Sequence, residues 1–478
     1  MAEKRGISFL TIISTVICVV FVCEAAAPAA AIGNQQFFWW IFLIITFLIP
    51  YGLAVAELGT TYDSEGGIID WIRDGLGDKW AARASYYYWV NYPFWIASLA
   101  TMFPDILNMA FGIKFNLAGS LIIELAFTWI VTIMAFSKVS DSEWVLNGGA
   151  IIKVAIAVTV GCLGIWYASQ HGFANDMSPQ TFLPSGNLNA LSYISIIIFN
   201  FMGFEVICTM TDDMKDPKVE IPRAIIMGGA AIAIIYLFCG FGIGAAIPAD
   251  KIDPDYGMLY AVLTMVGDSV LFKVICVAFL ITLFANMASW SFGVNSVAAY
   301  AAQTGNMPKA FGKMNPKTGM PDTAAIINGV VASLILCIQL VPIKAISNGI
   351  FWMLFSLSVV FLLLTYVPMF PAFMNLRKND PNRKRVYEFP FKGGMLKAAM
   401  IVPMIELIAV VITTVVPLSA DEVSTKMPML IGLIVLLVIG EVVRVVSARG
   451  RKEEYKGLTP ELAEQRLAEE AAAEKSEA

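Results

Sequence analysis

Three ionisable side chains lie within apolar stretches of the sequence, where a charge is costly. Glu24, Glu205 and Lys153 are each flanked by apolar residues on both sides. In the middle of a membrane helix such a residue costs about 2.5–3.5 kcal/mol on insertion scales, so it usually has a task. A carboxylate there can hold a cation, or take up a proton when the surroundings become dry. A lysine can replace a bound cation, or carry a proton if its pKa falls.

Each of these residues also has a purely structural interpretation. Glu24 could be hydrogen-bonded only to neighbouring backbone, and Glu205 could only pin the segment around it. For both glutamates we favour function, because a polar group without a task is expensive in an apolar segment. Lys153 could instead form a fixed ion pair with an acid on another helix, and the sequence leaves both interpretations open.

Aromatic residues in the same stretches could contact a cationic ligand. Stacking of a cation on such a ring contributes about 0.5–2 kcal/mol. For Phe199, Phe201 and Trp352 we favour simple packing over a ligand contact. Trp290 lies between Ala288-Ser289 and Ser291, and small neighbours of this kind make it the better candidate.

The composition indicates which elements position these residues. Of the 478 residues, 58% are hydrophobic and 14% are charged, and the mean hydropathy is +0.72. Soluble chains carry about 25% charged residues. Apolar segments of about 20 residues cross the bilayer as helices. We therefore predict an all-α membrane protein with twelve spans, at residues 7–32, 37–59, 86–113, 116–136, 145–168, 190–210, 223–247, 269–302, 324–343, 348–374, 396–417 and 427–447.

The positive charges predict the orientation of these spans in the cell membrane. Lys and Arg concentrate in cytoplasmic loops of membrane proteins. The dense run Arg377–Lys392 lies in a loop on the same side as the N-terminus, whereas loops on the other side hold at most one lysine. Both termini are thus expected in the cytoplasm. The first apolar stretch is longer than the core of a signal peptide, so we expect it to remain as a helix.

Two of the expected spans contain signals that interrupt a helix. Pro28 lacks an N–H, and its ring weakens the helix one turn back, near Glu24. The run 200–205 places Gly203 and Glu205 close together in the sixth span. Spans 1 and 6 each open a set of five helices. Broken helices at corresponding positions of two halves indicate an inverted-repeat transporter with its site at the midplane.

Several other functions lack a sequence signal. The seven cysteines form no C-x-x-C pair, and the only histidine, His171, lies in a polar loop. There is no nucleophile–base pair, metal-ligand set or phosphate-binding loop. We expect neither enzyme activity nor a metal, a cofactor or a nucleic-acid partner. A channel is the rival class, but the chain lacks a repeated filter segment and an Arg-rich voltage-sensor helix.

Several short motifs resemble those of the amino acid–polyamine–organocation superfamily. The similarity covers nearly all twelve spans and includes branches that exchange arginine for agmatine and glutamate for γ-aminobutyrate. Its motifs are Glu57-Leu58-Gly59, Glu65-Gly66-Gly67, Asp70-Trp71, Gly203-Phe204-Glu205, Asp216-Pro217-Lys218, Ile221-Pro222-Arg223 and Gly305-Asn306-Met307-Pro308, together with Lys153 in span 5 and Trp290 in span 8.

This resemblance implies the leucine-transporter-type fold. Residues 1–175 and 176–376 would form the two inverted repeats, 377–447 the two additional spans, and 448–478 a polar cytoplasmic tail. Matched position by position, it implies a proton-sensing role for Glu205, an aromatic gate at Phe199 and a substrate-facing Trp290. Lys153 would stand where sodium-dependent relatives bind a sodium ion.

One departure from the family pattern bears on the substrate. Relatives that bind α-amino acids use Gly-Ser-Gly in span 1, whose bare N–H groups hold the substrate carboxylate. This chain has Phe21-Val22-Cys23 followed by Glu24, and another carboxylate would be repelled there. A substrate without a carboxylate, such as agmatine or putrescine, fits this charge pattern, as does one that presents its amine. The glutamate/γ-aminobutyrate branch also departs from Gly-Ser-Gly.

We therefore interpret the chain as a sodium-independent antiporter of amino acids or amines that works by alternating access. The alternative within the class is a proton-coupled importer of neutral amino acids. The expected partners are the substrate and the lipid bilayer, and a homodimer is left open. The expected substrate-binding residues are Val22, Cys23, Glu24, Ala25, Phe199, Asn200, Gly203, Glu205, Trp290 and Trp352, with Lys153, Glu205 and Glu24 for proton or ion coupling.

Overall fold

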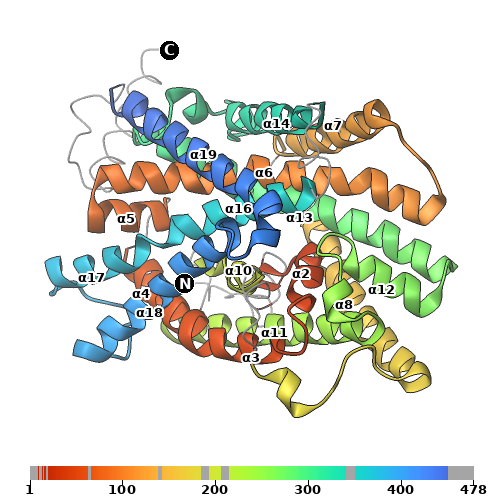
Figure 1. The fold of residues 1–478 in the computed structure, drawn as a ribbon. Helices are drawn as coiled ribbons and strands as arrows, with labels where there is room; N and C mark the ends of the chain where they lie inside the picture. The colour runs from red at the N-terminus through yellow and green to blue at the C-terminus, as the bar shows by residue number, and fades with distance from the viewer. Residues whose placement is uncertain are drawn as a thin grey trace.

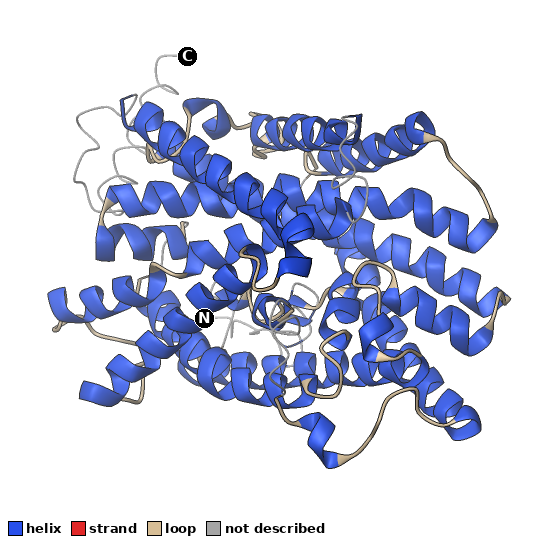
Figure 2. Cartoon of the chain, viewed as in Figure 1, coloured by secondary structure: helices blue, strands red, loops and turns tan. Residues whose placement is uncertain are grey.

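The computed structural model describes Phe9, Ile13 and residues 16–17, 20–62, 66–137, 143–184, 193–205, 215–340 and 350–449. Every regular element among these residues is a helix (Figure 2). Ten helical segments are long and apolar enough to cross a membrane. They coincide with ten of the twelve predicted spans. The predicted cytoplasmic tail, 448–478, lies outside the described residues apart from its first two residues.

Long helices such as α6 (Asp78–Phe111) and α11 (Pro217–Ala246) run across the view in Figure 1, and α18 (Gly393–Val415) and α19 (Val423–Arg449) lie at a slant to them. Gln36–Thr61 is continuous and consists of α3 (Gln36–Leu43), the π-helical turn η2 (Ile44–Leu48) and α4 (Ile49–Thr61). The others are α6 (Asp78–Phe111), α7 (Leu117–Met134), α8 (Glu143–His171), α11 (Pro217–Ala246), α13 (Val270–Gln303), α14 (Asp322–Leu336, extended by η8, Cys337–Leu340), α16 (Ile350–Tyr366) with α17 (Met369–Asn379), α18 (Gly393–Val415) and α19 (Val423–Arg449).

Shorter helices join or cap these long ones. α5 (Ile68–Leu76) packs against α6 and α17, and α12 (Gly257–Val266) packs against α11 and α13. Single turns complete the described elements: η4 (Pro179–Phe182), η6 (Ala249–Lys251), η7 (Lys309–Gly312) and η9 (Ala420–Glu422).

Predicted spans 1 and 6 are interrupted, and they lie at the centre of the molecule (Figure 1). In span 1 the turn η1 (Cys23–Ala25) and the helix α2 (Ala26–Ala30) follow two non-helical residues. Pro28 has no N–H to donate to the carbonyl of Glu24, so the helix lacks one backbone hydrogen bond at this turn. In span 6, α10 (Ile194–Phe199) ends before the non-helical residues 202–203. Both predicted interruptions are confirmed.

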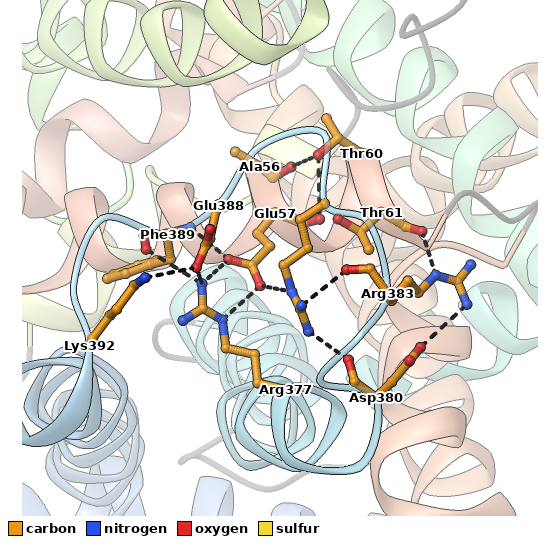
Figure 3. Close-up of polar contacts among 11 residues, drawn as sticks. Ala56, Glu57, Thr60, Thr61, Arg377, Asp380, Arg383, Glu388, Phe389 and Lys392 are labelled. Carbon is orange, nitrogen blue, oxygen red and sulfur yellow. Dashed lines mark hydrogen bonds and ion pairs between the residues drawn. The ribbon is translucent and has the colours of Figure 1, made fainter.

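A cluster of charges closes one end of the bundle (Figure 3). The buried carboxylate of Glu57 on α4 accepts hydrogen bonds from Arg377 Nε at 2.8 Å and from Arg385 Nε at 3.0 Å. It also accepts one from the backbone N–H of Phe389 at 2.6 Å. Arg383 lies over the ring of Tyr62 at 4.5 Å. The predicted basic loop after α17 is thereby fastened to the end of α4.

Acidic residues gather at the opposite end, where α12 lies (Figure 1). Tyr256 donates its hydroxyl to Asp105 on α6 at 2.7 Å, and Asp253 accepts the backbone N–H groups of Asp255 and Tyr256. The Asp255 carboxyl is largely buried in the turn before α12. Burial, together with the charges of Asp253 and Asp105, raises the pKa of Asp255 to about 7.

The helix α6 also makes contacts near both of its ends. Arg83, close to its beginning, forms an ion pair with Glu441 of α19 at 2.5 Å. Glu441 also pairs with Arg444, one turn away on the same helix, at 2.8 Å. Asp105, close to the end of α6, receives the Tyr256 hydroxyl described above. Pro93 and Pro104 lie inside this 34-residue helix.

Glu57→Gln is expected to destabilise the protein. It leaves Arg377 and Arg385, which are only 15% and 12% exposed, without their carboxylate. Breaking a buried ion pair in this way costs about 3–5 kcal/mol. The apparent melting temperature of purified protein in detergent should fall clearly. Glu388→Gln is the matched control, because Glu388 is 54% exposed and 4.0 Å from Arg377; equal melting temperatures for the two variants would contradict this account.

Asp255→Asn should change how stability depends on pH. An unfolded aspartate has a pKa of about 3.9, so between that pH and about 7 the folded protein binds a proton that the unfolded chain lacks. Stability should therefore fall as pH rises through this interval. The variant should lose this decrease and melt higher than the parent at pH 8. Asp250→Asn, on the exposed turn η6, should leave the profile unchanged.

Candidate functional site

The two interrupted segments are joined by one tyrosine of α11. The hydroxyl of Tyr236 accepts the backbone N–H of Val22 at 2.9 Å. The same hydroxyl lies 2.9 Å from the carbonyl oxygen of Val22 and 3.0 Å from Oδ1 of Asn200, to which it can donate. Its ring stacks on Trp40 at 5.1 Å and packs against Phe21 at 4.6 Å. Tyr236 thus supplies a partner for backbone groups of Val22 that a continuous helix would satisfy itself, and it links them to the side chain of Asn200.

The bare backbone of span 6 faces a tryptophan. Gly203 has φ of +100°, which side-chain-bearing residues rarely adopt. A Cβ at this position would meet the ring of Trp290 on α13 at 3.7 Å. Gly203 and Trp290 therefore lie next to each other in the structure.

Glu24 is buried beside this junction, at 2% exposure. Its Oε1 accepts a hydrogen bond from Nδ2 of Asn286 on α13 at 3.0 Å. Its Oε2 is buried and makes no well-formed hydrogen bond within the part of the chain that the structure describes, although the Trp95 indole lies near this carboxylate. Lys153 on α8, also 2% exposed, donates from Nζ to Oδ1 of Asn286 at 2.9 Å. Glu24 and Lys153 are thus linked through one amide.

Aromatic rings line the neighbouring wall. Trp95 of α6, whose indole lies near the Glu24 carboxylate, has its ring centre 5.2 Å from Trp290 and 5.3 Å from Phe199. Phe199 is in turn 5.6 Å from Phe355 of α16. Nε1 of Trp95 is buried and has no hydrogen-bond partner among the described residues. The site therefore combines an acid that can accept a donor, an indole N–H that can donate, and the edges and faces of aromatic rings.

Glu205 lies apart from this acid and belongs to a separate tyrosine cluster. Oε2 accepts the hydroxyl of Tyr51 on α4 at 3.0 Å, and Oε1 accepts that of Tyr366 on α16 at 2.5 Å. Glu205 thereby connects the end of the span 6 interruption to two long helices. Its predicted role in proton sensing stays a prediction.

The other predicted residues differ in how closely they approach Glu24. Cys23 and Ala25 share its helical turn, and Cys23 Sγ contacts the carbonyl oxygen of Lys153 at 3.5 Å. Trp352 packs on Tyr193 at 5.2 Å and on Phe355 at 6.3 Å, one ring layer behind Phe199.

Three residues of the site were missed by the sequence reasoning. These are Trp95, Tyr236 and Asn286. Tyrosine and tryptophan are ordinary in membrane spans, so neither Tyr236 nor Trp95 stands out. An uncharged amide inside a long apolar segment, as at Asn286, was the one available signal. Phe201 packs on Trp40 at 5.1 Å, in agreement with the packing interpretation.

Comparison with known proteins identifies the family. The model of the amino acid permease family matches residues 7–439. The chain belongs to this family. The permease is accordingly a multi-pass membrane transporter of amino acids or amines and not an enzyme, and the resemblance inferred from its motifs is confirmed.

Three relatives illustrate the range of similarity. The permease is 48% identical to the probable agmatine/putrescine antiporter AguD of Lactococcus lactis, over 92% of this chain and 95% of that protein. It is 22% identical to the glutamate/gamma-aminobutyrate antiporter of the same species, over 83% and 81%. The crystal structure of MhsT in complex with L-phenylalanine covers 86% of this permease and all of that chain, with 15% identity and a TM-score of 0.51. This last similarity shows the fold alone, which is the leucine-transporter type.

Tyr236→Phe should destabilise the permease and slow transport. The ring packing is kept, but the polar groups of Val22 and Asn200 lose their shared partner. Leaving buried polar groups unsatisfied costs about 1–3 kcal/mol. Thermal unfolding and uptake by proteoliposomes measure the two effects. Tyr260→Phe serves as the control, since this ring is 39% exposed on α12; a Tyr236 variant that behaves like it would refute the assigned role.

Proposed function

We propose that this permease is an antiporter that exchanges agmatine and putrescine at a site centred on Glu24. The observation that carries the proposal is the buried Oε2 of Glu24, which makes no well-formed hydrogen bond with the described residues although the Trp95 indole lies near this carboxylate. An ammonium or guanidinium group supplies the donors and the positive charge that this oxygen lacks. The similarity to a probable agmatine/putrescine antiporter supports the same class of substrate.

The backbone of span 1 disfavours a substrate carboxylate. The N–H of Val22, which could otherwise bind an anion, is bound to the hydroxyl of Tyr236. The side chains of Phe21, Val22 and Cys23 also hinder close approach to the main chain. A substrate carboxylate would lie beside the negative charge of Glu24, and like charges at such distances repel strongly in a dry interior. Amines without a carboxylate therefore fit this site better than α-amino acids.

The aromatic wall suits the second cationic end of such a substrate. Agmatine and putrescine are flexible aliphatic chains with a cationic group at each end. With one end at Glu24, the chain can pack along Trp95 toward Trp290 and Phe199. A guanidinium or ammonium over these rings gains about 0.5–2 kcal/mol each. The gating role of Phe199 belongs to this proposal.

Lys153 supports transport without sodium. Its ammonium provides a fixed positive charge in the buried core, next to Asn286 and the first interrupted span. Agmatine and putrescine are both divalent cations at neutral pH, so one-for-one exchange moves no net charge across the membrane. Such an exchange needs no coupling ion.

Alternating access would follow from a five-plus-five inverted repeat. In this proposal residues 1–175 and 176–376 form the repeats, spans 11 and 12 lie outside them, and both termini are cytoplasmic. Short broken helices at the start of each repeat hold the midplane site, and one set of helices rocks against the other. The cluster at Glu57 would then mark the cytoplasmic end, and Glu205, clamped by two tyrosines, would sense protons.

Glu24→Gln should weaken exchange strongly. Proteoliposomes loaded with putrescine should take up labelled agmatine by saturable counterflow, and the variant should raise KM at least tenfold. This estimate follows from a charge-assisted hydrogen bond of about 1.5–3 kcal/mol. Glu124→Gln is the matched control, since Glu124 is equally buried but bonded to Gln339 at the α7–α14 contact.

Three results would overturn the proposal. One is counterflow by Glu24→Gln that equals that of the parent. Another is uptake of a neutral amino acid that amines fail to inhibit, which would point to the proton-coupled importer. The third is flux that does not saturate, as in a channel.

A further inference from the structure

Asn286 connects the two buried charges of the site. Its Nδ2 donates to Glu24 Oε1 at 3.0 Å, and its Oδ1 accepts from Lys153 Nζ at 2.9 Å. All three side chains are at most 2% exposed. They come from three different elements, η1, α8 and α13, which contact one another. The two partners fix the orientation of the amide, because its NH₂ group faces the carboxylate and its carbonyl faces the ammonium.

An amide in this position separates the ammonium of Lys153 from the carboxylate of Glu24 and so prevents a direct ion pair. In a buried setting an ammonium and a carboxylate attract strongly when they meet directly. Asn286 instead gives each ion a hydrogen bond of the right polarity and takes up one carboxylate oxygen. The other oxygen, Oε2 of Glu24, is left buried without a well-formed hydrogen bond to the described residues.

We propose that Asn286 is a positioning residue that determines affinity for cationic substrates. By holding the ammonium of Lys153 at its carbonyl oxygen, it keeps this internal cation from occupying Glu24, so that the carboxylate is available to the substrate amine. This inference rests on the function proposed above. It assigns to the uncharged Asn286 the control of whether Lys153 or the substrate amine binds Glu24.

The test removes the amide and then the competing lysine. Asn286→Leu has a similar volume and offers neither donor nor acceptor, so Lys153 should turn to Glu24 and compete with the substrate. KM for agmatine in proteoliposomes should rise about tenfold. A change of this size corresponds to the loss of one hydrogen bond to a charged group. Adding Lys153→Met removes the competitor, so KM of the double variant should return most of the way to that of the parent. Such non-additivity is the signature of coupled residues.

Controls separate positioning from stability. Asn295→Leu removes another buried amide of α13, whose Oδ1 accepts from Asn328 Nδ2 at 2.6 Å. It should lower the melting temperature and leave KM unchanged. If Asn286→Leu does not fold, Asn286→Ala carries the same test, because the smaller side chain cannot clash.

The outcomes distinguish this inference from the proposed function. If the parent protein exchanges no amine, or if Glu24→Gln has no effect, the proposed function fails. If amine exchange depends on Glu24, two results overturn the inference alone. One is an Asn286 variant with unchanged KM, and the other is a double variant with KM no lower than that of the single variant.

Discussion

A helix that stops inside a membrane protein exposes N–H and C=O groups that no water can satisfy, and the rest of this structure depends on how they are met. In this chain the hydroxyl of Tyr236 serves Val22 and Asn200 at once, so the two interruptions share one partner. That arrangement requires α11 to pass beside both breaks, with Trp40 stacked behind the ring. The position of the site follows from this requirement.

The same constraint changes how the permease can recognise its substrate. When backbone N–H groups at a break are free, they are suited to an anion. Here the N–H of Val22 is bound to the Tyr236 hydroxyl, and the side chains of Glu24 and Trp95 offer polar groups to a ligand. In the proposed function, the preferred charge of the ligand is thereby reversed while the fold stays the same.

Much of the fold could be predicted from the sequence, because long apolar runs have few alternatives in a bilayer. Ten spans and both breaks were recognised, and Pro28 and Gly203 explain the breaks in local terms. The π-helical turn at Ile44–Leu48 gave no comparable signal.

The candidate site was only partly predictable. Glu24 and Lys153 stood out because charges are rare in such segments. Their relationship through Asn286 could not be inferred, since it joins residues 262 and 133 positions apart and runs through a neutral side chain. From the sequence, Lys153 could have a role in coupling or form a direct ion pair with an acid. In the structure the amide of Asn286 lies between Lys153 and Glu24. Tyr236 and Trp95 are ordinary residues for a membrane helix, and only their neighbours in space make them notable.

The two prolines inside α6 affect how this helix can bend. Its two internal prolines remove the helical hydrogen bonds to the carbonyls of Trp89 and Ala100, which makes these the places where the rod bends most easily. They divide α6 into three lengths, whose contacts include Arg83 with Glu441, Trp95 with the aromatic wall, and Asp105 with Tyr256. One helix therefore carries contacts at both ends and in the middle of the permease. A bend at either proline would displace the lengths of α6 relative to one another, and their contacts with them.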